Sequence, residues 1–595
     1  MDTIIRARRN INAQDGVTMT LLELRKNQNL KCISFVNIDF DERVTAEVMA
    51  FFASDARTWK ELRLLYCSGD VDAITMICLK MNNVKGLQLL FPEGPSCRQV
   101  SPILGLGSML KINTSLANLA VESRTMDTIE AKSLASGLRM NRTLRSLKLM
   151  FRSRPPGENV CTAFFELAKG FEHNKSLEEV DVNFMNCDFS CLFEALKDSR
   201  SIRKLNVQFP LLHASLVDLL RTSQATIDSF KFQTLRRQLP EDIVEAVQSH
   251  GSIVFLDLRA CPIPDPVATV LARLLLRNNS APTLRSLNLE CCEITDFGTN
   301  VIASALETNS TLQKVDISEN DFGLAGAAAL AHVLRTNSCL QELTLCQNNL
   351  TDACIEAFAD ALRVNSTLRI FNLALNDIMD HGAGRIAGAL KHNSTLQDLD
   401  LSSNGIRNIG AVALSQALLN TSGLRKLKMS GNPIGLEGAE SIARAMRTNS
   451  KLKIVALSSP NNRGNEDMKS LELKILKDNY ELECFEPCRR NYSYSREEIL
   501  HTMDLNRGGR KVLQNPNFPL NLWPFVLKRA DTILYYSGFT SATCEKPQQS
   551  VLYSLLRNGS VLFSRQNSGS SGPSLAPEQK NNEQKNKRKR NSISD

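Results

Sequence analysis

The sequence predicts an α/β solenoid in which short parallel strands line one face and helices line the other. The first observation is a leucine every 28 residues, at Leu284, Leu312, Leu340, Leu368, Leu396, Leu424 and Leu452. The second is that each leucine begins a run in which apolar and polar residues alternate, as in a strand with one buried face. The third is that each run is followed by apolar residues at helical spacing. A fixed period of this size is typical of stacked repeats.

The strand is clearest in the unit that begins at Leu312. Val315 and Ile317 alternate with polar residues, and Asn320 follows the strand. An asparagine suits a place where the chain turns away from the strand, because its amide can both donate to and accept from unpaired backbone groups. The sequence therefore predicts a structural asparagine ladder, formed by Asn320, Asn348, Asn376, Asn404 and Asn432. Cys292 holds this place in the preceding unit.

The helix of the same unit is predicted around residues 326–334. Leu330, Ala331 and Leu334 form one apolar face, and equivalent apolar or small residues recur in the other units. A glycine opens most of these helices, and Cys354 breaks that series. One strand and one helix cannot bury both of their faces alone, so we expect the units to fold as a stacked array.

The unit Leu396-x-x-Leu399-x-Leu401-x-x-Asn404, with its glycine-opened helix, resembles the leucine-rich repeat of the ribonuclease-inhibitor type. The resemblance covers residues 253–459 and extends to the repeats of NOD-like receptors and of the activator of the Ran GTPase. It implies a right-handed horseshoe with parallel strands on the concave face and helices on the convex face.

The pattern continues upstream with looser spacing, and it divides the chain. Further strands are expected to begin at Leu30, Trp59, Val84, Leu116, Leu144, Leu177, Ile202, Ile227 and Ile253, which brings the predicted strands to 16. The helices between them should differ in length or be replaced by loops. The predicted parts are an N-terminal cap (1–29), degenerate repeats (30–252), regular repeats (253–459), a terminal repeat with a helical C-terminal cap (460–565) and a disordered basic tail (566–595).

The C-terminal parts leave two questions open. The block Leu505-Asn-Arg-Gly-Gly-Arg510, followed by Trp523-Pro, is similar to one in leucine-rich-repeat families of unicellular eukaryotes, and it is either a cap or a separate recognition module. In the tail, Lys587, Arg588, Lys589 and Arg590 match a nuclear-localisation cluster, or they form a solvated charge run. Ser592 resembles a kinase site, and a phosphate there would weaken the cluster.

Composition and motifs exclude several classes of protein. The 595 residues carry a net charge of only +8, so nucleic acid is not an expected partner. The N-terminus lacks a signal peptide and no stretch of 18 apolar residues occurs, so we expect an intracellular protein whose 16 cysteines are reduced and which does not engage membranes. The common catalytic and metal-binding motifs are missing. We therefore expect no enzyme activity, no small-molecule substrate, no metal site and no cofactor.

The outward strand positions remain for function, because core packing does not dictate them. The candidate partner-binding residues on the concave face are Lys314, Asp316, Ser318, Glu342, Thr344, Asn372, Asp398, Asp400, Ser402, Lys426 and Lys428. Each of them could also be only a solvated surface residue. The leading interpretation is a non-enzymatic scaffold that binds a protein partner on this face. The alternatives, a regulator of a small GTPase and an innate-immune-type sensor, rest on the family resemblance.

Overall fold

The computed structural model describes residues 2–6, 21, 32–36, 39–40, 42–54, 58–65, 68–69, 83–90, 103–123, 126–151, 160–184, 190–208, 214–223, 226–234, 238–276, 284–421, 423–457 and 484–486. The predicted helical cap, the basic cluster Lys587–Arg590 and Ser592 lie outside these residues.

One parallel sheet of 18 strands runs through the described chain, and each strand pairs with the next one along it. The strands are β1 (Asp2–Arg6), β2 (Cys32–Val36), β4 (Glu61–Leu65), β6 (Gly86–Leu90), β7 (Asn118–Ser123), β8 (Ser146–Phe151), β9 (Glu179–Phe184), β10 (Lys204–Gln208), β11 (Ser229–Gln233), β12 (Phe255–Asp257), β13 (Ser286–Asn288), β14 (Lys314–Asp316), β15 (Glu342–Thr344), β16 (Ile370–Asn372), β17 (Asp398–Asp400), β18 (Lys426–Lys428), β19 (Ile454–Ala456) and β20 (Cys484–Glu486). A second, two-stranded sheet pairs β3 (Asp39–Phe40) with β5 (Ser68–Gly69).

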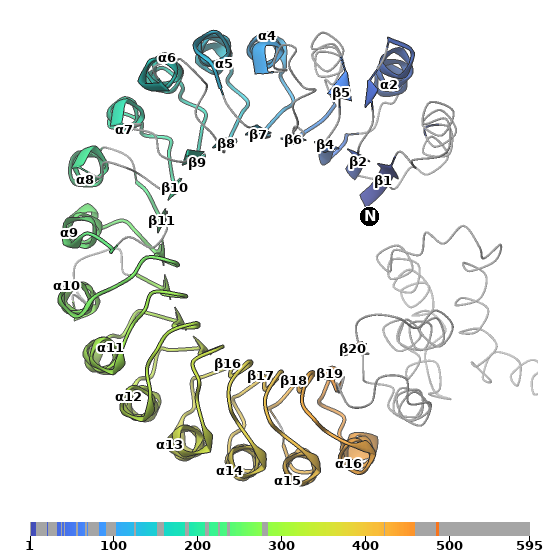
Figure 1. The fold of residues 1–595 in the computed structure, drawn as a ribbon, viewed down its shortest axis with the longest axis vertical. Helices are drawn as coiled ribbons and strands as arrows, with labels where there is room; N and C mark the ends of the chain where they lie inside the picture. Colours follow the sequence, from blue (N-terminus) through green and yellow to red (C-terminus); the bar gives the residue numbers. More distant parts are fainter. Residues whose placement is uncertain are drawn as a thin grey trace, which may run out of the picture.

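Helices alternate with these strands and form the outer rim of a horseshoe whose inner rim is the sheet (Figure 1). The described helices are α2 (Glu42–Ser54), α4 (Ile103–Ile112), α5 (Thr128–Met140), α6 (Val160–Glu172), α7 (Ser190–Leu196), α8 (Ala214–Thr222), α9 (Glu241–His250), α10 (Asp265–Leu276), α11 (Asp296–Thr308), α12 (Leu324–Thr336), α13 (Asp352–Val364), α14 (Asp380–Leu390), α15 (Asn408–Leu418) and α16 (Leu436–Thr448). The fold is therefore the predicted α/β solenoid.

The loosely spaced half folds on the same plan as the regular half. All nine upstream strands form where the leucine pattern places them, and their helices differ in length, down to the seven residues of α7. The sheet has two more strands than the 16 predicted. One of them, β1, lies within residues 1–29, which the sequence assigned to an N-terminal cap; the other, β20, lies in the predicted terminal repeat.

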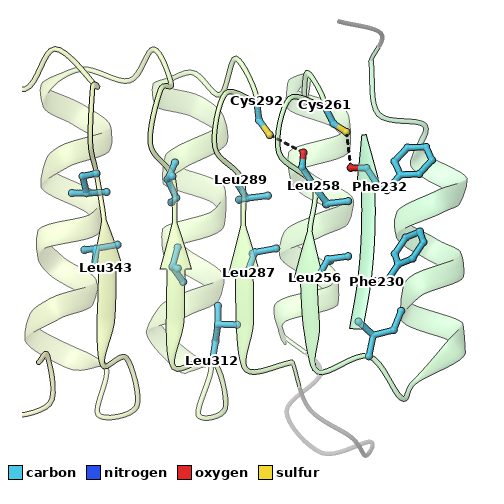
Figure 2. Close-up of a cluster of buried hydrophobic side chains, with 14 of the residues drawn as sticks. Phe230, Phe232, Leu256, Leu258, Cys261, Leu287, Leu289, Cys292, Leu312 and Leu343 are labelled. Atoms are coloured by element: carbon cyan, nitrogen blue, oxygen red, sulfur yellow. Dashed lines mark hydrogen bonds between the residues drawn. The ribbon is translucent and has the colours of Figure 1, made fainter. Parts of the chain in front are cut away.

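The core is a continuous layer between strands and helices. Each unit contributes its inner strand residues, such as Leu256, Leu287 and Leu343, and these stack from one repeat to the next (Figure 2). The predicted helix face Leu330, Ala331 and Leu334 is also buried. Burial of this kind is the main favourable contribution to folding, and it links neighbouring units.

Hydrogen bonds from the asparagines join neighbouring units at the end of each regular strand. Asn348 Nδ2 donates to the Ile317 carbonyl in the preceding unit at 2.9 Å, and its backbone N–H donates to Asn376 Oδ1 at 2.9 Å. In the two units that precede Asn320, a cysteine thiol makes the bond to the preceding unit. The Cys261 thiol donates to the Phe232 carbonyl, and the Cys292 thiol donates to the Leu258 carbonyl (Figure 2). Burial raises the pKa of Cys261 to about 12 and also raises that of Cys292, so both thiols stay protonated.

A second series of buried asparagines follows the helices and is shared by both halves. Asn337 Nδ2 donates to the Leu306 carbonyl of the preceding helix, while Asn337 Oδ1 accepts from the Leu340 N–H that leads into the next strand. Equivalent Nδ2 bonds are made by Asn141, Asn174, Asn309, Asn365, Asn393 and Asn449, and Asn113 Oδ1 accepts from the Leu116 N–H. These residues explain why Asn-Ser-Thr triplets recur in the sequence, because the asparagine is buried and bonded in each repeat.

Candidate functional site

The candidate partner-binding residues lie on β14 to β18 or just after these strands, on the side opposite the buried leucines. In β17, Leu399 is fully buried, whereas Asp398 and Asp400 are partly exposed on the concave face. The alternation that predicted these positions thus placed the side chains on the expected side of the sheet.

Most of the charges among these residues are paired across neighbouring strands. Lys426 Nζ lies 3.3 Å from Asp398 Oδ2, and Lys428 Nζ lies 3.2 Å from Asp400 Oδ2. Lys314 Nζ lies 2.8 Å from Glu342 Oε2 in the same way. The two lysines of β18 therefore face the aspartates of β17, which neutralise their charge. A partner of this region therefore meets ion pairs and little net charge.

Several polar residues of the face also hold the backbone at the strand end. Asp400 Oδ1 accepts from the Ser402 N–H at 3.0 Å, and Asp316 Oδ1 accepts from the Ser318 N–H at 3.0 Å. Asn372 Oδ1 makes the equivalent bond to the Ala374 N–H. These residues favour the turn after the strand, so their identity is set partly by structure.

One predicted contact residue is not on the accessible surface. Ser318 is buried, and its hydroxyl accepts a hydrogen bond from the Cys346 N–H of the next unit at 3.1 Å. The alternation of a strand no longer applies there, because the following residue, Glu319, has a φ of 55° and the chain is already turning. Its expected role in partner contact was wrong.

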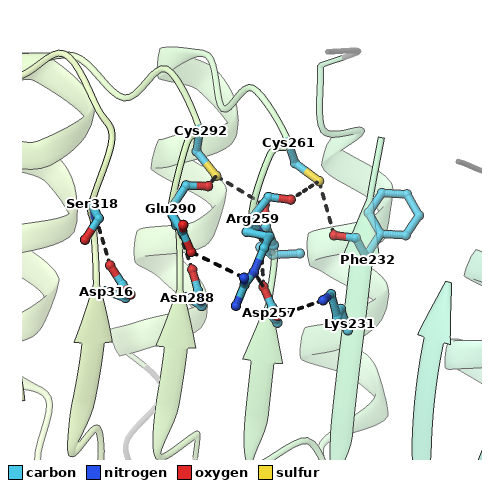
Figure 3. Close-up of polar contacts among 11 residues, drawn as sticks. Lys231, Phe232, Asp257, Arg259, Cys261, Asn288, Glu290, Cys292, Asp316 and Ser318 are labelled. Atoms are coloured by element: carbon cyan, nitrogen blue, oxygen red, sulfur yellow. Dashed lines mark hydrogen bonds and ion pairs between the residues drawn. The ribbon is translucent and has the colours of Figure 1, made fainter. Parts of the chain in front are cut away.

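A denser polar network lies upstream, on β11 to β13. Asp257 of β12 lies between Lys231, 3.6 Å away on β11, and Arg259, 3.3 Å away on its own strand end (Figure 3). Arg259 also reaches Glu290, at 3.5 Å, in the next unit. Burial lowers the pKa of Arg259, but the carboxylates of Asp257 and Glu290 raise it more, so the guanidinium stays charged. The network contains two cations and two anions.

The same strip of the face continues onto β9 and β10. Lys148 Nζ lies 3.4 Å from Asp181 Oδ2, and burial raises the pKa of Asp181 although Lys148, Asn206 and Lys231 oppose the shift. Asn183 donates to Gln208 Oε1 at 2.7 Å. The candidate list omitted these residues because it was confined to the regular repeats. Counting the third, fifth and seventh positions from Leu144, Leu177, Ile202 and Ile227 would have found them.

The other expectations concern chemistry and exposure. The histidines His332, His381 and His392 of the regular repeats are exposed. Within the described residues, no group of three or more histidine, cysteine or acidic side chains is arranged to hold a metal ion. Among the helices that the structure describes, none is long and apolar enough to cross a membrane.

Comparison with family models finds the leucine-rich repeat, at residues 280–298, 308–331, 364–387, 392–415 and 424–443. The described array is a leucine-rich repeat solenoid. The matched segments all lie in the regular half, and the looser leucine-rich repeats upstream continue the same sheet. Their strand–helix units are those of the ribonuclease-inhibitor type that the sequence resembles.

Comparison with solved structures also found matches. Leiomodin-1 actin-binding site 2 is 22% identical, with a TM-score of 0.22, and the match covers 26% of this chain and 90% of that chain. The mouse RP105/MD-1 complex is 14% identical, with a TM-score of 0.39, and the match covers 76% of this chain and 72% of that chain. No curated protein matches the leucine-rich repeat chain in sequence. These likenesses do not indicate what this chain binds.

Proposed function

We propose that the chain is a non-enzymatic scaffold that binds a protein partner on the concave face of its leucine-rich repeats. The supporting observation is the row of outward strand side chains, which differ from unit to unit while the residues behind them repeat. The leucines, the asparagines and the helix columns are all engaged in stacking. The concave residues are less constrained by core packing, and a varied polar surface can select one partner by its pattern of hydrogen bonds and charges.

The balance of charge on this face favours a protein partner over nucleic acid. Lys426 and Lys428 face Asp398 and Asp400, and the network around Asp257 is also balanced. Nucleic-acid sites instead concentrate unpaired lysines and arginines, because most of their affinity comes from phosphate contacts. The roles of GTPase regulator and immune-type sensor stay predictions from the resemblance.

A charge-neutral variant tests the proposal. Asp398→Asn, Asp400→Asn, Lys426→Gln and Lys428→Gln together remove two anions and two cations, and an asparagine at 400 keeps an acceptor for the Ser402 N–H. We expect this variant to lose partner proteins that the wild-type chain captures from an extract of its own cells, with unchanged circular dichroism. Exposed ion pairs contribute about 0–1 kcal/mol each to stability, so the fold should persist.

The matched control removes an ion pair from the convex side. Arg221 of α8 and Glu245 of α9 are 3.4 Å apart on the helical rim, and Arg221→Gln with Glu245→Gln also conserves net charge. This control should capture the same proteins as wild type. If the concave variant also retains every captured protein, the partner does not use this part of the face.

A further inference from the structure

The concave face has a half-exposed aromatic ring at its centre. Phe255 is 50% exposed, and among the strand residues whose side chains the structure describes it is the only large hydrophobic one with an exposure of this order. Its neighbours in sequence, Val254 and Leu256, do not share its direction: Leu256 is buried in the core, so alternation turns Phe255 to the concave side. About half of Phe255 is thus left uncovered by the packing of the solenoid.

The strands on both sides leave room around the ring. Phe255 pairs in register with Ser229 of β11 and Ser286 of β13. Serine is short, so the phenyl ring projects above its two neighbours along the row. A second side chain can therefore approach the ring face from solvent without displacing a large residue.

Polar side chains with equal numbers of positive and negative charges, here called the collar, lie on the C-terminal side of the ring. The next outward positions on the three strands are Lys231, Asp257 and Asn288, and beyond them lie Arg259 and Glu290 (Figure 3). Lys231, Asp257, Arg259 and Glu290 are joined by ion pairs and carry no net charge together. The collar therefore does not require a charged group on the partner.

We propose that Phe255 is the anchor of the concave site, where a protein partner inserts one large apolar side chain against the ring. This inference rests on the proposed function and identifies the residue that contributes most to the affinity for the partner. Protein interfaces commonly place a desolvated aromatic contact at the centre of a polar rim, and a few such residues supply most of the affinity. The neutral collar favours an apolar side chain of the partner. A charged side chain would gain little there, because each charge of the collar is already paired.

The test uses a library of random dodecapeptides displayed on phage, selected against the full chain. We expect the selected peptides to share one leucine, methionine or aromatic residue. Synthetic labelled peptides are then titrated by fluorescence anisotropy with wild type and with Phe255→Ala. Loss of the ring should weaken binding at least tenfold, and alanine at the shared apolar position of the peptide should have a similar effect.

The convex rim offers a matched control. Phe165 of α6 is 55% exposed, and Phe165→Ala removes an equally accessible ring from the opposite face. This variant should bind the peptides as wild type does. Phe255→Leu keeps an apolar side chain and should give an intermediate affinity, which provides a second measurement if Phe255→Ala does not fold.

Three results would overturn the anchor: equal affinity for wild type and Phe255→Ala, equal losses in Phe255→Ala and Phe165→Ala, or a selection that yields no peptide with an apolar contact residue. The proposed function is judged separately by partner capture with the variant at 398, 400, 426 and 428. Loss of capture there, with unchanged binding by Phe255→Ala, removes the anchor and leaves the concave scaffold.

Discussion

Asp380 Oδ1 accepts a hydrogen bond from the backbone N–H of Gly410 at 2.7 Å. Asp380 begins α14 and Gly410 lies in the first turn of α15, so a carboxylate of one helix satisfies an unpaired N–H of the next. Asp296 and Asn408 make the same contact with Gly326 and Gly438. The helices α12, α15 and α16 are thus capped by the preceding helices.

This capping explains the glycines that open the helices. A Cβ at Gly410 would lie 2.8 Å from Asp380 Oδ1 and 2.8 Å from Ile406 Cγ2. The exception among these glycines supports the explanation. Cys354 stands in the glycine position of α13. In the preceding helix the residue equivalent to Asp380 is Leu324, which has no carboxylate. A side chain is tolerated where the capping oxygen is missing.

Gly410→Ala should therefore lower the free energy of unfolding, by about 1–3 kcal/mol, as overpacking does elsewhere. In an Asp380→Leu background the same substitution should cost less, because the contact with Asp380 Oδ1 is gone and only those with Ile406 Cγ2 and Ala383 Cβ remain. Urea unfolding of the four proteins gives the coupling energy directly. Strictly additive losses would show that the carboxylate does not make glycine necessary.

The asparagine ladder should be intolerant of apolar residues. Asn376 Nδ2 donates to the Leu345 carbonyl at 2.9 Å, while Asn376 Oδ1 accepts from the N–H groups of Asn348 and Leu350. Asn376→Leu leaves these buried groups unpaired, each at about 1–3 kcal/mol. We expect the thermal midpoint to fall by several degrees or more.

Asn376→Cys is the informative companion. A thiol can donate to the preceding carbonyl, as Cys292 does, but it is a weak acceptor for two N–H groups. Its midpoint should lie between those of wild type and Asn376→Leu. A midpoint equal to wild type would mean that the accepting side of the amide contributes nothing.

The strands and the helix faces could be predicted from the sequence, because both depend on hydrophobic periodicity. Trp59, Leu116 and Leu177 are buried as predicted even where the spacing is irregular. The contacts between units were harder to foresee. Asp380 looks like an ordinary acidic residue in a first turn, and only the stacked geometry shows that it serves the next helix.

The candidate site was predicted only in part, for a similar reason. Alternation gave the direction of Asp398 and Asp400, but it could not give the pairing with Lys426 and Lys428, which depends on strand register. Ser318 was misplaced because the chain turns before its side chain reaches solvent.

Close packing of the upstream helices gives the next prediction. A Cβ at Gly107 of α4 would collide with the carbonyl oxygen of Ser133 in α5. Because the obstacle is backbone, the helices must separate, and Gly107→Ala should destabilise the upstream repeats by roughly 1–3 kcal/mol. Hydrogen exchange of α4 and α5 amides measures the loss locally.

Gly384 of α14 is the control, since a Cβ there meets nothing within 4 Å. Gly384→Ala should slow exchange in its helix, because alanine is favoured over glycine in a helix by up to about 1 kcal/mol. Faster exchange in both variants would point to a general intolerance of alanine.

His250 makes the stability of the array depend on pH. It takes the place that asparagine holds in the second series, and its Nδ1 donates to the Leu220 carbonyl at 2.9 Å. Burial lowers the pKa of His250, so the folded chain keeps it neutral. Above pH of about 6.5 the unfolded chain is neutral there too, and no penalty arises. As the pH falls below this value, the unfolded chain gains the proton before the folded chain does, so stability decreases, at no more than about 1.4 kcal/mol per pH unit.

His250→Asn isolates this contribution, because asparagine restores the donor used in the other units and does not titrate. Urea unfolding at pH 7.5, 6.5 and 5.5 should show a smaller loss of stability on acidification for the variant than for wild type. All other residues are the same in both proteins, so the difference between the two profiles reports on position 250. Parallel pH profiles would assign the acid sensitivity to other groups, and they would leave His250 with only its bond to Leu220.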